Sequence, residues 1–246
     1  MWRSLRAALG LVRLLMHLVH GVWTVRRSFP RWSNARREDA VQRWAQAGLR
    51  ILGIELQVGG AAPCPGPVLL VANHISWVDI LVLHALRHCR FVSKSEVKHW
   101  PVMGGLATAA GTLYIERESR RDAMRVVHHM AESLQAGEVV AVFPEGTTSD
   151  GTGVLPFHAN LLQAAIVVQS PVQPVALTYL DRESGTITQA AAYVGDDSLL
   201  ASLWRLLRAG GVVVKLTLGA AQTAQGRDRR QMARDLAQAV TDLRQP

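Results

Sequence analysis

A histidine and an aspartate stand five residues apart in the stretch VLLVANHISWVDI, residues 68–80. An imidazole is the side chain suited to accept a proton near neutral pH, so His74 and Asp79 are candidates for acid–base catalysis. The plainer alternatives are a solvated loop histidine and an aspartate that simply favours the first turn of a helix. The elements that surround the pair must decide between these interpretations.

A second stretch of the same kind is VVAVFPEGTTSDG, residues 139–151. Its β-branched run ends abruptly at Pro144, and the loop beyond brings a carboxylate, Glu145, together with glycine and hydroxyl residues. Ordinary turn formation would also explain the composition of this loop. A serine hydrolase is disfavoured, because Ser149 lacks the G-x-S-x-G surroundings of a nucleophile elbow.

The apolar runs before these two loops are expected to be buried strands of a parallel sheet. Both runs are short and rich in valine, and the first follows a proline- and glycine-rich segment, residues 63–67. Open α/β sheets bind their ligands beyond the carboxyl ends of the strands, where loop residues converge without disturbing the sheet. His74 and Glu145 therefore lie where strands would deliver them to the ligand-binding edge.

Repeated alternation of strand and helix patterns predicts an α/β domain with a mixed, mostly parallel sheet flanked by helices on both faces. The expected strands are 55–58, 68–72, 90–93, 112–116, 139–143, 172–178, 187–193 and 212–218. The expected helices are 35–52, 77–87, 120–136, 159–169, 199–207 and 229–243. With 246 residues, 49% of them hydrophobic, the chain is long enough for one such domain.

The N-terminal segment, residues 1–32, is expected to associate with a membrane as an amphipathic helix, ahead of a catalytic domain at 33–246. Nineteen mostly apolar residues lie between Arg6 and Arg26, about the length that spans a bilayer. Four polar residues at helical spacing form one stripe among them: Arg13, His17, His20 and Thr24. Arginines flank both ends, so an interfacial anchor is favoured over a spanning helix. A helix packed on the protein's own core is the alternative.

The formal net charge of +8 and the sequence pI of about 10.4 indicate an anionic partner. No nucleic acid is expected as that partner, since no helix-turn-helix, zinc-finger or RNA-recognition signature accompanies the charge. The arginines around the N-terminal segment favour the surface of a membrane, with anionic lipid, instead. The two cysteines, Cys64 and Cys89, lack CxxC spacing, so neither a metal site nor a disulfide framework is predicted.

Four motifs resemble those of the PlsC-type glycerolipid acyltransferases, which are 1-acyl-sn-glycerol-3-phosphate acyltransferase-like proteins. NHISWVD, from Asn73 to Asp79, resembles their NH-x4-D motif, also written HX4D, and FPEGTTSDG resembles their FPEGT-R-S motif. GTLYIER, ending at Arg117, and VQPVAL, residues 172–177, resemble two further motifs of the family. Four motifs in the family's order are far more specific than any one of them.

The resemblance implies a membrane-bound O-acyltransferase of lipid metabolism that needs no cofactor. His74 would be the general base, and Asp79 would orient its ring. The acyl chain would pass from acyl-CoA or acyl carrier protein to the free hydroxyl of a lysolipid, with 1-acyl-sn-glycerol-3-phosphate of phospholipid biosynthesis as the first acceptor. A lyso-ornithine lipid or another phosphate-free lysolipid is an alternative acceptor. A non-catalytic, basic membrane-binding protein of the same fold is the alternative from another class.

The same resemblance assigns the acceptor's headgroup to residues near the two loops. The substrate-binding residues that it implies are Arg117, Glu145, Gly146, Thr147 and Thr148. Lys94, at the end of the expected strand 90–93, is a further candidate for an anion contact, with a solvated surface lysine as the alternative. The chain departs from the family where an arginine usually follows FPEGT, since Thr148 stands there. This change weakens the phosphate-binding side of the site and leaves His74 and Asp79 intact. The expected location is the cytoplasmic face of the inner membrane, as a peripheral or monotopic protein.

Overall fold

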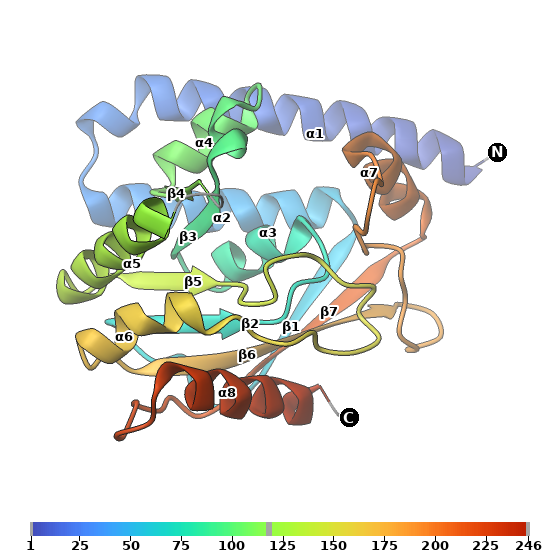
Figure 1. The fold of residues 1–246 in the computed structure, drawn as a ribbon. Coiled ribbons are helices and arrows are strands. Elements are labelled where there is room, and N and C mark those ends of the chain that lie inside the picture. The colour runs from blue at the N-terminus through green and yellow to red at the C-terminus, as the bar shows by residue number, and fades with distance from the viewer. Residues whose placement is uncertain (1, 117–119, 245–246) are drawn as a thin grey trace.

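A seven-stranded sheet with helices on both faces organises the computed structural model, which describes residues 2–116 and 120–244 (Figure 1). The strands are β1 (Ile54–Gly60), β2 (Val68–Ala72), β3 (Arg90–Lys94), β4 (Leu113–Ile115), β5 (Val139–Val142), β6 (Val172–Asp181) and β7 (Val212–Leu218). Their order is β1-β7-β6-β2-β5-β3-β4, and each neighbouring pair is parallel except β6 with β7. The predicted fold class is confirmed.

The strands β2 and β5 lie side by side inside the sheet, and every residue of both is buried. Alternate side chains of β2 point to opposite faces, so that Leu70 and Ala72 join one core cluster and Leu69 and Val71 join the other. A strand covered on both faces must be apolar throughout, which explains why neither run alternates with polar residues. The loops that follow β2 and β5 are consequently held at one edge of the sheet.

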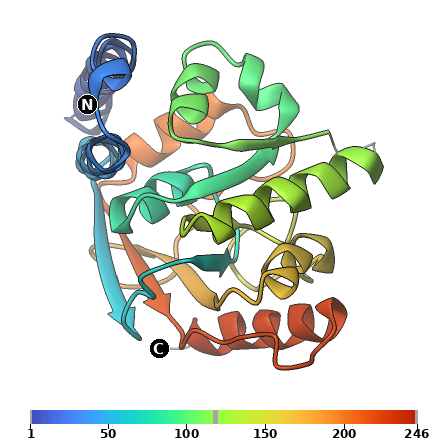
Figure 2. The same cartoon turned by 90° about the vertical axis from the view of Figure 1, so that its left-hand side faces the viewer.

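The helices divide between the two faces. They are α1 (Trp2–Arg27), α2 (Asn34–Ile51), α3 (Val78–Leu86), α4 (Met103–Ala109), α5 (Arg120–Gln135), α6 (Gln163–Val167), α7 (Leu199–Arg208) and α8 (Arg229–Leu243). Three short 3-10 segments accompany them: η1 (Phe29–Arg31), η2 (Ser95–His99) and η3 (Ala159–Leu162). Side chains of α2, α3 and α7 build one core cluster, and those of α5, α6 and α8 build the other. Figures 1 and 2 both place α1 on the opposite side of the molecule from α8.

The long helix α1 packs on α2 through a polar contact. The His17 ring stacks on Trp44 with 4.5 Å between centroids, and each residue hydrogen-bonds the other's backbone carbonyl through a ring nitrogen. The helices approach closely here because Gly21 has no side chain, and a Cβ at this position would lie 2.7 Å from Trp44 Nε1. His17, one residue of the predicted polar stripe, therefore faces the protein.

Much of the remaining surface of α1 is apolar and exposed. Its exposed large side chains are Leu5, Leu9, Val12, Leu15, Met16, Val19 and Trp23. Within the described chain, one helical stretch, Ser4–Arg31, is long and apolar enough to cross a membrane, with a mean hydropathy of 1.5 and only 11% of its most apolar window buried. The alternative of a helix packed on the protein's own core describes only part of α1, since Leu11 and Leu14 pack against the core while the side chains named above stay exposed.

The structure corrects the expected elements in three places. Residues 187–193 form no strand, only an isolated bridge between Ile187 and Leu180, because Ile187 is exposed and the buried residues, Ala191 and Ala192, are consecutive and not alternate. The expected helix 159–169 is divided into η3 and α6 and ends by residue 167. The sequence patterns also missed α4, a short helix rich in glycine and alanine.

Candidate active site

The loop that follows β2 and the loop that follows β5 meet at the carboxyl edge of the sheet. The backbone carbonyl of His74 accepts hydrogen bonds from the amide of Ser149 at 2.8 Å and from its hydroxyl at 3.2 Å. The His74 ring stacks on Phe143, the residue after β5, with 4.0 Å between centroids and an interplanar angle of 9°. Hydrogen bonding and stacking together fix the ring between the two loops.

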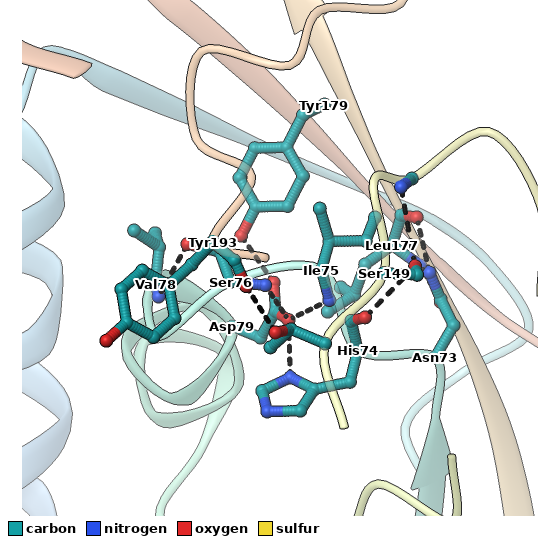
Figure 3. A network of polar contacts seen from close by, with 12 residues as sticks. Asn73, His74, Ile75, Ser76, Val78, Asp79, Ser149, Leu177, Tyr179 and Tyr193 are labelled. Carbon is teal, nitrogen blue, oxygen red and sulfur yellow. Dashed lines mark hydrogen bonds and ion pairs between the residues drawn. The ribbon is translucent and has the colours of Figure 1, made fainter. Parts of the chain in front are cut away.

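His74 and Asp79 form a hydrogen-bonded pair. His74 Nδ1 lies 2.8 Å from Asp79 Oδ2, and the same oxygen accepts the backbone N–H groups of Ile75 at 2.7 Å and Ser76 at 2.8 Å (Figure 3). The side chain of Asp79 is fully buried, whereas that of His74 is 18% exposed. Asp79 also lies in the first turn of α3, where the helix dipole favours a negative charge. The helix-start interpretation and the catalytic one therefore describe the same residue.

The second nitrogen of the His74 ring points away from Asp79 (Figure 3). Because Asp79 is an acceptor of backbone N–H groups, the hydrogen-bond network assigns the ring proton to Nδ1. Nε2 then carries a lone pair, and the ring is open to solvent on the side away from the buried carboxylate. This arrangement suits a general base whose far side is held by an anionic partner.

Asn73, the first residue of the NH-x4-D motif, connects β2 to β6. Its side-chain amide donates to the carbonyl of Leu177 at 3.0 Å, and its side-chain oxygen accepts the amide N–H of Leu177 at 2.7 Å. The strands are paired only as far as Ala72 and Val175, so this side chain continues the contact beyond their last ladder residues. Asn73 thus locks the loop that carries His74 onto a neighbouring strand.

Sequence reasoning missed Tyr179. This fully buried tyrosine on β6 places its hydroxyl 2.5 Å from Asp79 Oδ1, across 100 residues of sequence. Burial and the nearby charge of Asp79 raise the pKa of the Tyr179 hydroxyl well above its ordinary value, so that it stays a proton donor. The available signal was a tyrosine in a strand that is mostly buried, since a buried tyrosine usually needs a partner for its hydroxyl.

Glu145, one of the expected substrate-binding residues, lies inside the protein. The residue is 3% exposed, and its carboxylate oxygens have no hydrogen-bond partner among the described residues that meets ordinary geometry. Burial, with a smaller contribution from the charge of Asp79, raises the pKa of Glu145 to about 7, although the nearby backbone N–H groups of His74 and Leu155 oppose the rise. Its position indicates a role in the loop's structure.

This buried carboxyl predicts a pH-dependent stability. The pKa of Glu145 is about 7 in the folded chain, against an ordinary value of 4.5. Between these two pH values the folded state therefore binds more protons than the unfolded state does. Its contribution to the free energy of unfolding should therefore fall as the pH rises from about 5 to about 8, by about 2–4 kcal/mol. Urea unfolding at both pH values should show that the free energy of unfolding of Glu145→Gln does not fall in this way. The control Glu183→Gln, on an exposed loop, should show the same fall as wild type. Equal slopes for wild type and Glu145→Gln would contradict the assignment.

The other predicted substrate residues lie in different surroundings. Thr148 donates its hydroxyl to the backbone carbonyl of Tyr193, so this hydroxyl ties the loop to the segment before α7 and is not free for a headgroup. Thr147 is exposed, and Gly146 has a positive φ of 70° with His158 3.2 Å from the position of a Cβ. Lys94 is exposed at the end of β3. Arg117 lies outside the described residues.

Metal chemistry has no support in the described part of the chain. Residues 2–116 and 120–244 contain no group of three histidine, cysteine or acidic side chains that could hold an ion. Cys64 and Cys89 are both free thiols, and burial raises the pKa of Cys89 far above its ordinary value, which leaves it unreactive.

The fold and the histidine–aspartate pair at its carboxyl edge define a class of acyl-transferring enzymes. A family model described as "Acyltransferase" matches residues 55–178, which is half of the chain and includes both loops of the site. The chain belongs to this acyltransferase family, of the PlsC type.

The relatives of the chain act on lysolipids. It is 41% identical over 233 residues to the lyso-ornithine lipid O-acyltransferase of Pseudomonas aeruginosa, a match that covers 94% of this chain and 88% of that protein. It is 40% identical over 195 residues to the 1-acyl-sn-glycerol-3-phosphate acyltransferase of Neisseria gonorrhoeae, covering 78% and 76%. The crystal structure of the 1-acyl-sn-glycerophosphate acyltransferase PlsC from Thermotoga maritima superposes with a TM-score of 0.71 at 19% identity, over 100% of this chain and 96% of that one. The last match supports the fold alone.

Proposed function

We propose that this chain transfers a fatty acyl group from a thioester, acyl-CoA or acyl carrier protein, to the free hydroxyl of a lysolipid, with His74 as the general base. The observation that carries the proposal is the 2.8 Å contact between His74 Nδ1 and the buried carboxylate of Asp79, with Nε2 on the open side. Nε2 would take the proton of the acceptor hydroxyl as its oxygen attacks the thioester carbonyl. The negative charge of Asp79 would stabilise the imidazolium that forms.

The rest of the reaction follows from the balance of protons and electrons. The new C–O bond forms a tetrahedral intermediate, and its collapse breaks the C–S bond. The proton held at Nε2 then passes to the leaving thiolate, so that the imidazole returns to its starting state. Because the acceptor oxygen attacks directly, no acyl-enzyme is required.

Two acceptors are proposed in order. The first is 1-acyl-sn-glycerol-3-phosphate, on which the relative in Neisseria gonorrhoeae is named to act. A specific observation favours a lyso-ornithine lipid as the second, because Thr148 replaces the motif arginine and gives its hydroxyl to Tyr193. A phosphate binds best to an arginine guanidinium, which presents a fixed fork of hydrogen-bond donors, and Thr148 has no guanidinium.

The experiment is an acceptor panel with one labelled acyl-CoA and purified full-length protein. Release of the thiol only when a lysolipid is present would support the enzyme and exclude the non-catalytic membrane-binding alternative. The ratio of kcat/KM for lysophosphatidic acid and lyso-ornithine lipid ranks the two acceptors. Thioester hydrolysis that proceeds equally without any lysolipid would contradict the proposal.

We further propose that residues 1–32 bind the cytoplasmic face of the inner membrane, through anionic lipid, and that 33–246 form the catalytic domain. The exposed apolar surface of α1 supports this placement, since large apolar side chains favour the acyl region and arginines at both ends favour anionic headgroups. The triple change Leu9→Glu, Leu15→Glu and Val19→Glu should lower the affinity for anionic vesicles at least tenfold, because three apolar side chains no longer enter the interface.

Vesicle co-sedimentation measures this loss. The matched control changes three exposed apolar residues on other elements, Met124→Glu, Val167→Glu and Ile187→Glu, and should co-sediment as wild type does. If both triple variants lose binding equally, the effect is one of net charge and α1 is not the specific anchor.

A further inference from the structure

We propose that Tyr179 is a positioning residue for the acyl transfer, acting on His74 through Asp79. The inference rests on the proposed function, because it assigns a further residue to the same general base. The hydroxyl of Tyr179 lies 2.5 Å from Asp79 Oδ1, the carboxylate oxygen that His74 does not use (Figure 3). Tyr179 and Asp79 are both buried, so water cannot replace the hydroxyl.

The sheet explains how the hydroxyl reaches Asp79. Val175, Leu177 and Tyr179 are alternate residues of β6 and join the core cluster on the face that α3 covers. Asp79 lies on α3, so the tyrosine and the aspartate face each other on the same side of the sheet. The double hydrogen bond of Asn73 with Leu177 holds this part of β6 beside the loop of His74. Antiparallel pairing with Val214 of β7 supports Tyr179 from the other side.

Each oxygen of Asp79 has a separate task. Oδ2 accepts the ring N–H of His74 and two backbone N–H groups, whereas Oδ1 accepts the hydroxyl of Tyr179. The tyrosine therefore fixes the rotation of the carboxylate and with it the direction in which the imidazole points. The hydrogen bond also draws electron density from the carboxylate, which weakens its hold on a proton at the His74 ring. Tyr179 thus sets the geometry of the pair and the strength of the hydrogen bond between Asp79 and His74.

Few other charges act on this network. Glu145 is the other buried acidic group near Asp79, and the two charges repel each other. Arg244, after α8, lies near Glu145 and donates to the backbone carbonyl of Gly151. Neither residue contacts Tyr179 in the hydrogen bonds described, so a change at Tyr179 leaves them in place.

The test is Tyr179→Phe, which removes one oxygen and keeps the ring that fills the core. The buried Oδ1 loses its donor, and a hydrogen bond to a charged group is worth about a 10- to 100-fold effect, so kcat should fall by this factor. KM for donor and acceptor should stay unchanged, because Tyr179 is buried away from both. The acid limb of the kcat/KM profile should move to higher pH, since Asp79 then holds the His74 proton more strongly.

A second variant guards against a simple packing defect. Site-specific 3-fluorotyrosine at position 179 keeps the hydroxyl and makes it a stronger donor, so the acid limb should move to lower pH, opposite to Tyr179→Phe. The matched control is Tyr114→Phe. The hydroxyl of Tyr114 lies 2.9 Å from the hydroxyl of Thr108 on α4, outside the site, so this variant should behave as wild type.

The outcomes separate this inference from the proposed function. Wild-type kcat and an unmoved acid limb in Tyr179→Phe, with His74→Ala inactive, would overturn the role of Tyr179 alone. A fall in kcat with no movement of the acid limb in either variant would show a purely structural residue and also overturn it. A wild-type protein that transfers no acyl group to any lysolipid would remove the proposed function, and this inference with it.

Discussion

His74→Ala is expected to lower kcat by about 10²- to 10⁴-fold without unfolding the protein. The loss follows from the proposed role of the ring as proton acceptor, since Asp79 is fully buried and cannot take the proton of the acceptor hydroxyl in its place. Stability should change little, because the side chain is partly exposed and its backbone contacts with Ser149 remain. The measurement is the steady-state formation of acylated lysolipid, with circular dichroism as the test of folding.

The control for this prediction is another histidine. His129 is exposed on α5, where it contacts Glu132, and His129→Ala should change kcat less than about twofold because surface substitutions away from the site have small effects. Turnover at the wild-type rate in a folded His74→Ala protein would remove His74 as the general base.

Asp79→Asn is expected to lower kcat by about 10²- to 10³-fold and to leave KM for the donor nearly unchanged. Asparagine keeps the size of the side chain and one oxygen for the backbone N–H groups of Ile75 and Ser76. The negative charge that stabilises the imidazolium is lost, so the cost appears when the proton is transferred and not when substrates bind.

The double variant gives the sharper test. If Asp79 acts only through His74, then adding Asp79→Asn to His74→Ala should cost almost nothing further, because the residue it supports is already gone. Single-turnover rates for the four members of the cycle measure this coupling. If the reduction in rate of the double variant equals the product of the two single reductions, Asp79 contributes by another route, for example through the start of α3.

The sequence predicted the site where the relevant contacts are local. Asp79 reaches His74 within one strand–turn–helix unit, because the short segment between them connects the loop after β2 to the first turn of α3. The buried strands β2 and β5 were predicted correctly for the same reason, since a continuous valine-rich run suits only a strand covered on both faces. The motif resemblance added the reaction, and the matched family confirms it as an acyltransferase.

The errors arise where local pattern and tertiary environment disagree. Residues 187–193 were expected as a strand, yet Ile187 is exposed, and the segment ends beside the site, where the amide of Tyr193 donates to the carbonyl of Ile75. Thr148 was expected at a headgroup, but its hydroxyl contacts Tyr193. A propensity or a motif position describes a residue's usual surroundings, and neither can show which distant segment packs against it.

By itself, then, the sequence determined the strands that end at the site, the pair His74 and Asp79, and the apolar character of α1, because each depends on residues close in the chain. Only the tertiary structure decided that Glu145 is buried and that Tyr179 completes the pair. Tyr179 is 100 residues from Asp79, and the two meet only because β6 lies beside β2 and turns alternate side chains toward α3. Such a contact depends on strand order and register, which are set by the packing of the whole sheet and not by any single segment.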